Sequence, residues 1–232
     1  MFETGRVART AVTALCALAV AAGCSSGDDD PAPAPTTLIG VTTMRGALLQ
    51  ANEIGPTWTA PEDTPDPTHL VGICGGTATA PTVPPGAEVV SAPFADEGET
   101  GAQTLEQTAL VYPEPTAAAA AQAALRAVAE NCQANVSVPA TVTNDKSEPA
   151  YTESVQIQPL TQDGWSGFAV IRHKKYEPTH PGTADTAVVV LNKVNVVLVD
   201  AYAIYRLNNA SSSPGFDADW PKLVGTVIQR VG

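Results

Sequence analysis

The sequence predicts an α+β domain, an antiparallel twisted β-sheet flanked by helices. Apolar runs of strand length recur between residues 87 and 204, and turn residues such as Asp163-Gly164 separate neighbouring runs. An Ala-rich stretch with helical periodicity interrupts them at residues 116–133, and a second amphipathic stretch ends the chain. Strands joined by short turns, with helices before, between and after them, are typical of α+β domains.

The first half of the domain contains two predicted helices and a hairpin. Thr42–Ile54 suits a short amphipathic helix, because Gly55-Pro56 ends its apolar spacing. Ala87–Ala95 and Gln103–Tyr112 have the pattern of a β-hairpin around an acidic loop. Thr116–Gln133 is the clearest helix, since a potential N-cap precedes a run of strong helix formers.

The second half is predicted to be a meander closed by a helix. The expected strands are Val138–Thr143, Thr152–Leu160, Trp165–His173, Ala184–Leu191 and Val194–Ile204. The last two are apolar on both faces, which indicates central strands covered on both sides, and Asn192-Lys193 suits a tight turn between them. In the closing helix, Asp219 is the expected cap and Pro221 the expected first-turn residue.

Residues 1–23 have the organisation of an export signal. Arg6 and Arg9 precede the apolar run Ala11–Ala22, which is too short to span a bilayer permanently. The run closes on Ala21-Ala22-Gly23-Cys24, which resembles the lipobox of bacterial lipoproteins, although Ala21 stands where Leu or Val is usual. We therefore expect cleavage before Cys24 and acylation, including palmitate, on its thiol; the alternative is an ordinary secretory peptide that contains a Cys.

Residues 24–39 are expected to form a disordered tether rich in Pro and Asp. Asp28-Asp29-Asp30 and Pro31–Pro35 contain no side chain that can pack, and Pro-rich segments remain extended. Residues 40–232 are then one domain, held by lipid on the extracytoplasmic face of the cell membrane. The formal net charge of −12 disfavours nucleic acid as a partner.

Two cysteines, Cys74 and Cys132, remain for the folded part. An even pair outside the cytoplasm is most simply a disulfide bond. The alternative is a metal site, but two thiols without a nearby His make a poor zinc site.

A wider pattern resembles the extracellular sensor domain of mycobacterial PknH-type Ser/Thr kinases and the actinobacterial lipoproteins built on it. The matching segments are Leu48-Leu49-x-x-Glu53-Ile54-Gly55, Cys74-Gly75-Gly76, Leu110–Pro113 leading into the helix to Cys132, the hairpin Val188–Val199 and the closing helix before Val231. The resemblance implies an antiparallel sheet with a large cleft for an unidentified extracellular ligand. Two features depart from it: no kinase or transmembrane helix accompanies the domain, so a signal needs a partner, and a further cysteine pair common in the family is missing.

No known catalytic motif is present. The sequence has no Gly-x-Ser-x-Gly elbow, no phosphate-binding loop and no His-Glu-x-x-His helix. Ser166 with His173 is the one pair to check for hydrolase chemistry, and His173 with His180 is too loosely spaced to indicate a metal. We expect no enzyme activity, no cofactor and no metal.

Four aromatic residues are the weakly supported candidates for lining a ligand site: Trp58, Trp165, Tyr202 and Tyr205. Each is also compatible with core or rim packing. The leading hypothesis is a sensor that binds a small-molecule or cell-envelope ligand. The alternative is a structural or interaction lipoprotein of the envelope with a protein partner, which would present a flat apolar patch.

Overall fold

A computed structural model describes residues 37–62, 66–98, 101–142, 147–207 and 215–232, which belong to one compact unit, Thr36–Gly232. The predicted export signal, Cys24 and the tether as far as residue 36 lie outside the described residues.

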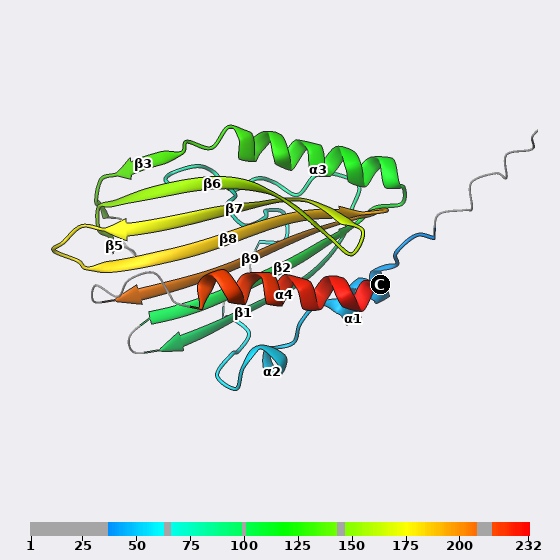
Figure 1. Cartoon of the computed structure of the whole chain (residues 1–232), viewed down its shortest axis with the longest axis horizontal. Coiled ribbons are helices and arrows are strands. Elements are labelled where there is room, and N and C mark those ends of the chain that lie inside the picture. The colour runs from blue at the N-terminus through cyan, green and yellow to red at the C-terminus, as the bar shows by residue number, and fades with distance from the viewer. Residues whose placement is uncertain (1–36, 63–65, 99–100, 143–146, 208–214) are drawn as a thin grey trace, which may run out of the picture. The chain divides into compact units, whose positions relative to one another are not determined.

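The unit is built on a seven-stranded antiparallel sheet (Figure 1). Its order is β1-β2-β9-β8-β7-β6-β3, and every neighbouring pair is antiparallel. The strands are β1 (Glu88–Gly98), β2 (Gly101–Val111), β3 (Asn135–Val138), β6 (Tyr151–Gln162), β7 (Trp165–Tyr176), β8 (Gly182–Lys193) and β9 (Val196–Leu207). A two-stranded ribbon, β4 (Thr141–Val142) with β5 (Ser147–Glu148), lies outside this order. The predicted α+β fold class is confirmed.

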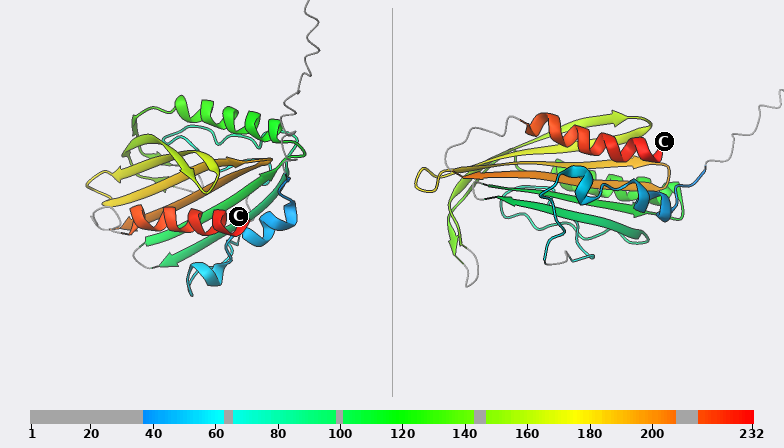
Figure 2. Two further views of the ribbon diagram at one scale, coloured as in Figure 1. Left: turned by 45° about the vertical axis from the view of Figure 1, so that its right-hand side comes forward. Right: turned by 90° about the horizontal axis from the view of Figure 1, so that it is seen from below.

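Helices cover both faces of the sheet (Figures 1 and 2). Helices α1 (Val41–Ala47) and α4 (Phe216–Val231) contribute to the apolar cluster on one face, which we call the α4 face. Helix α3 (Pro115–Glu130) contributes to the cluster on the opposite face, the α3 face. A single-turn helix, α2 (Ala51–Ile54), follows α1.

The central strands alternate between these two clusters, as predicted from their two apolar faces. In β8, Val189 and Leu191 belong to the cluster with α4, whereas Val188 and Val190 belong to the cluster with α3. All four side chains are fully buried. The turn lies two residues later than predicted, at Val194–Asn195, because Lys193 is already paired with Val196.

Asn195, in this turn, fastens the start of the domain to the sheet. Its buried side chain accepts a hydrogen bond from the amide of Ile39 (2.8 Å) and donates to the carbonyls of Ile39 (3.1 Å) and Tyr112 (2.7 Å). The Asn195 side-chain amide therefore satisfies the backbone N–H and C=O of Ile39, as a neighbouring strand would.

The predicted helix at Thr42–Ile54 is in fact two helices. Leu48 adopts an extended backbone between them, and the Leu49 amide donates to Oε1 of Gln107 (3.0 Å). Nε2 of Gln107 in turn donates to the Leu49 carbonyl (3.3 Å). The buried Gln107 side chain thus hydrogen-bonds both the amide and the carbonyl of Leu49, which a continuous helix would need for its own hydrogen bonds.

Two other predicted boundaries are also corrected. The expected strand Val138–Thr143 is divided between β3 and β4, with Pro139 and Ala140 in neither strand. Helix α4 begins at Phe216, after Gly215, so Pro221 is inside the helix and Asp219 is in its first turn.

The predicted Cys74–Cys132 disulfide is confirmed, with a Cα–Cα distance of 5.2 Å. It joins the loop before β1 to the end of α3. The next residue, Gly75, has no room for a side chain, because a Cβ atom there would collide with the Glu153 carboxylate. Gly76 has a φ of +67° and donates its amide to Oε2 of Glu153 (2.7 Å). The Cys-Gly-Gly sequence therefore allows this loop to lie directly on β6.

Candidate functional site

Two of the four predicted ligand residues, Trp58 and Tyr202, line one pocket on the α4 face. The pocket has a volume of about 340 Å³ and lies among α2, α4 and the ends of β2 and β9. We call it the Trp58–Tyr202 pocket. Leu49, Ile54 and Leu223 give it apolar walls, and its polar side chains are those of Glu53, Gln103, Asp219, Lys222, Thr226 and Arg230.

Local sequence explains how these elements present their side chains. Asp219, Leu223, Thr226 and Arg230 recur at three- or four-residue intervals, so they follow one stripe along α4. Across the pocket, Trp58 lies over Gly55, where an added Cβ would approach Cδ1 of the indole to 2.9 Å. The Gly55-Pro56 sequence thus both ends α2 and makes space for the indole.

Tyr202 forms the polar end of the apolar region. Its hydroxyl donates to Oε1 of Gln103 (2.7 Å), and its ring stacks on Phe216 with the centroids 6.1 Å apart. Burial, followed by the nearby Asp219 carboxylate, raises the pKa of Tyr202. The hydroxyl therefore remains protonated at neutral pH.

A bidentate ion pair joins α4 to α2 at another part of the pocket. Nη2 and Nη1 of Arg230 donate to Oε1 (2.7 Å) and Oε2 (3.2 Å) of Glu53. The hydrogen bonds from Arg230, and then one from the Gln50 amide, lower the pKa of Glu53. Arg230 and Glu53 are 177 positions apart in the sequence.

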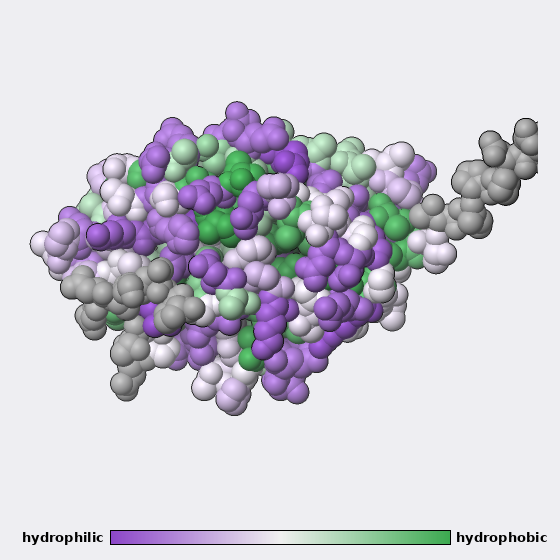
Figure 3. All heavy atoms as spheres, in the orientation of Figure 1, coloured by the Kyte–Doolittle hydropathy of each residue, from purple (hydrophilic) through white to green (hydrophobic). Residues whose placement is uncertain are grey.

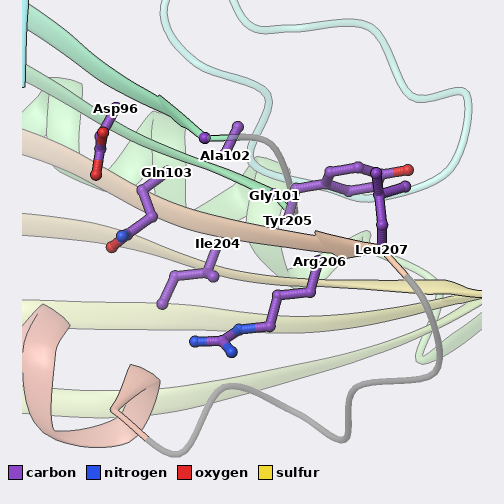
Figure 4. A pocket seen from close by; sticks show the side chains of 9 residues that line it. Asp96, Gly101, Ala102, Gln103, Ile204, Tyr205, Arg206 and Leu207 are labelled. Carbon is purple, nitrogen blue, oxygen red and sulfur yellow. The ribbon is translucent and has the colours of Figure 1, made fainter. Parts of the chain in front are cut away.

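A second, more polar hollow adjoins the first at the strand ends (Figure 4). It has a volume of about 290 Å³ and is lined by Asp96, Gln103 and Arg206 together with the glycines of the β1–β2 hairpin. Gln103 lines both hollows, so they are neighbours, and we refer to the two together as the candidate cleft. The cleft combines apolar walls with carboxylate, amide, hydroxyl and guanidinium groups, which suits a small ligand with both polar and apolar parts.

Of the other two predicted ligand residues, Tyr205 lines the second hollow and Trp165 lines neither hollow. In Figure 4, the Tyr205 ring projects from the side of β9 opposite to Ile204 and Arg206. It packs against Tyr176 on the α3 face, with a centroid distance of 5.8 Å. Trp165 has no exposed surface and lies in the core beneath α4. This position agrees with the alternative of core packing, which periodicity could not distinguish because it places Trp165 on a strand but not beneath a helix.

The predicted hydrolase pair is not assembled. Ser166 and His173 lie seven residues apart on β7, which corresponds to about 23 Å, and an odd separation places them on opposite faces. His173 is paired with Asp185 (Nδ1 to Oδ1, 2.8 Å) and His180 with Glu177 (3.4 Å). Among the described residues, no group of three or more His, Cys, Asp or Glu is placed to hold a metal ion.

The surface view bears on the alternative of a protein-interaction role. On the face shown in Figure 3, apolar areas between α3 and α4 are interrupted by polar side chains. The large exposed apolar residues in the described ranges are on separate elements: Leu38, Val142, Ile157 and Leu207. No helix in those ranges has both the length and the apolar character needed to cross a membrane.

Sequence reasoning missed Gln103, Glu53 and Arg230 as pocket residues. Glu53 was part of the segment that carried the resemblance, but nothing in the linear sequence marks its pairing with Arg230. Gln103 has the appearance of an ordinary polar position near a strand end. Only the arrangement of α2, α4 and the sheet brings these groups together.

Comparison with known proteins places the fold. No protein-family model matches the chain, and no curated protein matches its sequence. The structure is similar to the extracellular domain of PknH from Mycobacterium tuberculosis, with a TM-score of 0.50 and 13% sequence identity. The match covers 84% of this chain and 97% of that domain. At this identity the similarity establishes a shared fold, namely that of an extracellular domain.

Proposed function

We propose that this chain is a lipid-anchored extracytoplasmic lipoprotein whose domain is a non-enzymatic sensor for a small ligand. The observation that carries the proposal is the meeting of Trp58 and Tyr202 with Gln103 in one cleft. Small-molecule sites are typically concave and mostly apolar, with a few oriented polar groups, and commonly begin near 300 Å³. The similarity to an extracellular domain supports the location.

The ligand is a small or cell-envelope molecule with an apolar part and several hydrogen-bonding groups. Trp58, Ile54 and Leu223 offer contact to the apolar part, while Gln103 and Asp219 offer hydrogen bonds. A non-enzymatic role is supported by the separation of Ser166 from His173. The lipid on Cys24 then keeps the domain at the membrane, where a partner receives the signal.

Native mass spectrometry of the folded unit, residues 36–232, purified gently from its native host, tests ligand binding. We expect an added mass on the wild-type domain. The Tyr202→Phe variant removes the hydroxyl that faces Gln103, so it should retain less than about one tenth of that occupancy. Tyr112→Phe, which removes a hydroxyl that donates to the Pro84 carbonyl on the opposite face, is the matched control and should retain the mass.

A clean unliganded mass, or equal retention by Tyr202→Phe and Tyr112→Phe, contradicts the proposal. In that case an envelope protein partner becomes the better reading. The anchor is tested separately with full-length protein in its host: wild type should partition into the detergent phase of a Triton X-114 extract, and Cys24→Ala into the aqueous phase. Partition of Cys24→Ala with the wild type would contradict acylation at this position.

A further inference from the structure

Lys174, near the end of β7, has its ammonium group enclosed by side chains from β5, β6 and β7. Nζ lies 3.9 Å from the ring centroid of Tyr151 on β6 and 5.6 Å from that of Tyr176. It also donates to Oε1 of Glu148 on β5 at 2.8 Å. A carboxylate combined with aromatic faces is the chemistry that proteins use to bind organic ammonium ions.

The aromatic wall extends across the sheet. Tyr176 makes edge contacts with Tyr151 on one side (5.7 Å) and with Tyr205 on the other (5.8 Å). Its hydroxyl donates to the same Glu148 oxygen (3.1 Å), and burial, followed by Glu148, raises the pKa of Tyr176 so that this donor stays protonated. The wall is therefore held by ring contacts and by the hydrogen bond to Glu148, whereas the Lys174 side chain remains 20% exposed on a flexible stem.

An open hollow of about 710 Å³ adjoins this ammonium site. Tyr151 and Tyr176 belong to both, and Val138, Pro139 and Pro178 add apolar surface to the hollow. A ligand whose ammonium group lies over Tyr151 therefore has space for its apolar part in the hollow. Lys174 is not among the residues that line the hollow, whereas the neighbouring Lys175 is.

We propose that Tyr151, Tyr176 and Glu148 form a second binding site, specific for a small organic ammonium ion, in which Lys174 is an exchangeable internal occupant. The ligand ammonium replaces Nζ of Lys174, and its apolar part contacts the hollow. This site is on the α3 face, so it is independent of the Trp58–Tyr202 pocket on the α4 face. Tyr205 closes the far side of Tyr176 without touching the cation.

The internal occupant has a measurable consequence. An external cation binds only when Lys174 has left the site, so its apparent affinity is reduced by the fraction of molecules in which the site is open. Removing the Lys174 ammonium should therefore increase affinity, although it removes a positive charge from an otherwise intact ion pair.

Choline chloride is the probe, titrated by isothermal calorimetry into the wild-type domain and into Lys174→Ala. We expect Lys174→Ala to bind at least tenfold more tightly than wild type. Lys193→Ala, which removes a charge from the end of β8 and outside the hollow, is the matched control and should match wild type. Adding Tyr151→Leu or Glu148→Gln to Lys174→Ala should weaken binding at least tenfold.

Two results overturn the proposal: equal affinities for Lys174→Ala and Lys193→Ala, or equal binding of 3,3-dimethylbutan-1-ol, the neutral isostere of choline. If Lys174→Ala does not fold, the NMR spectrum of the wild-type domain provides a second test. The ε-methylene protons of Lys174 should be shifted upfield by the Tyr151 ring, and saturating choline should return them toward their free position. No return relative to sodium chloride at equal ionic strength also overturns it.

Discussion

Asp200 is a carboxylic acid in the middle of the core beneath α4. It lies on the central strand β9, is 1% exposed, and its Oδ2 accepts no hydrogen bond within the described residues. The residue opposite Asp200 on β2 is Gln107, whose side-chain amide is already hydrogen-bonded to the backbone of Leu49 and Ala92. Burial raises the pKa of Asp200 to about 7 from an ordinary 3.8.

This pKa predicts how stability depends on pH. Because the folded protein holds the proton more tightly than the unfolded chain, stability is fully present below about pH 4 and is lost as the pH rises toward 7. A shift of this size corresponds to an upper bound of about 4 kcal/mol. In urea unfolding, Asp200→Asn should therefore gain about 2–3 kcal/mol over wild type between pH 5 and pH 8.

Asp163→Asn makes the same chemical change at the exposed β6–β7 turn and is the control. Its stability should differ from wild type by a constant amount across this range. If Asp200→Asn behaves in the same way as Asp163→Asn, Asp200 does not hold a proton in the folded state.

At the scale of the elements, each exposed edge of the sheet carries a proline, in β1 and in the part of β6 that β3 does not cover. In β1, Ala95 exchanges hydrogen bonds with Thr59 outside the sheet, so Pro93, two residues earlier, also faces outward. In β6, the Val155 amide donates outward to Ala134, so Pro159, four residues later, faces outward as well. Neither proline removes a hydrogen bond inside the sheet. Because proline has no backbone N–H, each edge also has one donor fewer with which another chain could pair.

Pro159→Thr restores an outward amide on the part of β6 that β3 does not cover, because β3 pairs only as far as Ser154. We expect the variant to aggregate several-fold faster on mild heating, measured by light scattering. Gln158→Thr introduces the same side chain where the backbone already faces β7, and it should aggregate at the wild-type rate. Equal rates for the two variants would show that this edge is not protected by Pro159.

The elements that could be predicted from sequence are those with a strong local pattern. The Ala-rich α3, the β1–β2 hairpin and the doubly apolar β8 and β9 depend on periodicity that lies within one segment. The division between α1 and α2 could not be predicted, because Gln107, 58 residues from Leu49, supplies the competing hydrogen bonds. Likewise, Trp165 could be assigned to a strand, but its burial depends on packing between distant elements.

At the scale of the whole molecule, the Cys74–Cys132 bond fixes the cover of the α3 face. It spans 58 residues and joins the loop that contacts Glu153 to the end of α3. In the chain-entropy model, closing a loop of this length contributes about 4 kcal/mol. A Cys74→Ala/Cys132→Ala double variant should lose stability of that order in urea unfolding.

The loss should be matched by wild type treated with reductant, whereas reductant should leave the double variant unchanged. A double variant as stable as the oxidised wild type would mean that the packing of the loop on β6 suffices without the bond.

The candidate cleft was only partly predictable for the same reason. Trp58 and Tyr202 could be nominated as large aromatic residues with polar atoms, but their meeting requires α2, β9 and α4 to converge. Glu53 and Arg230 illustrate this best, because their ion pair spans nearly the whole domain. No periodicity within a segment carries that information.

The anchoring of Ile39 by Asn195 has a mechanical consequence. If the chain is held at the membrane through Cys24, any tension on the domain enters along the residues just before α1. The first resistance is then the two hydrogen bonds between Ile39 and the Asn195 side chain at the turn between β8 and β9, and a third holds that side chain to Tyr112. The load therefore passes into the two central strands of the sheet and not into an edge strand that could be peeled away. A domain tethered in this way is expected to keep its cleft intact while the envelope around it moves.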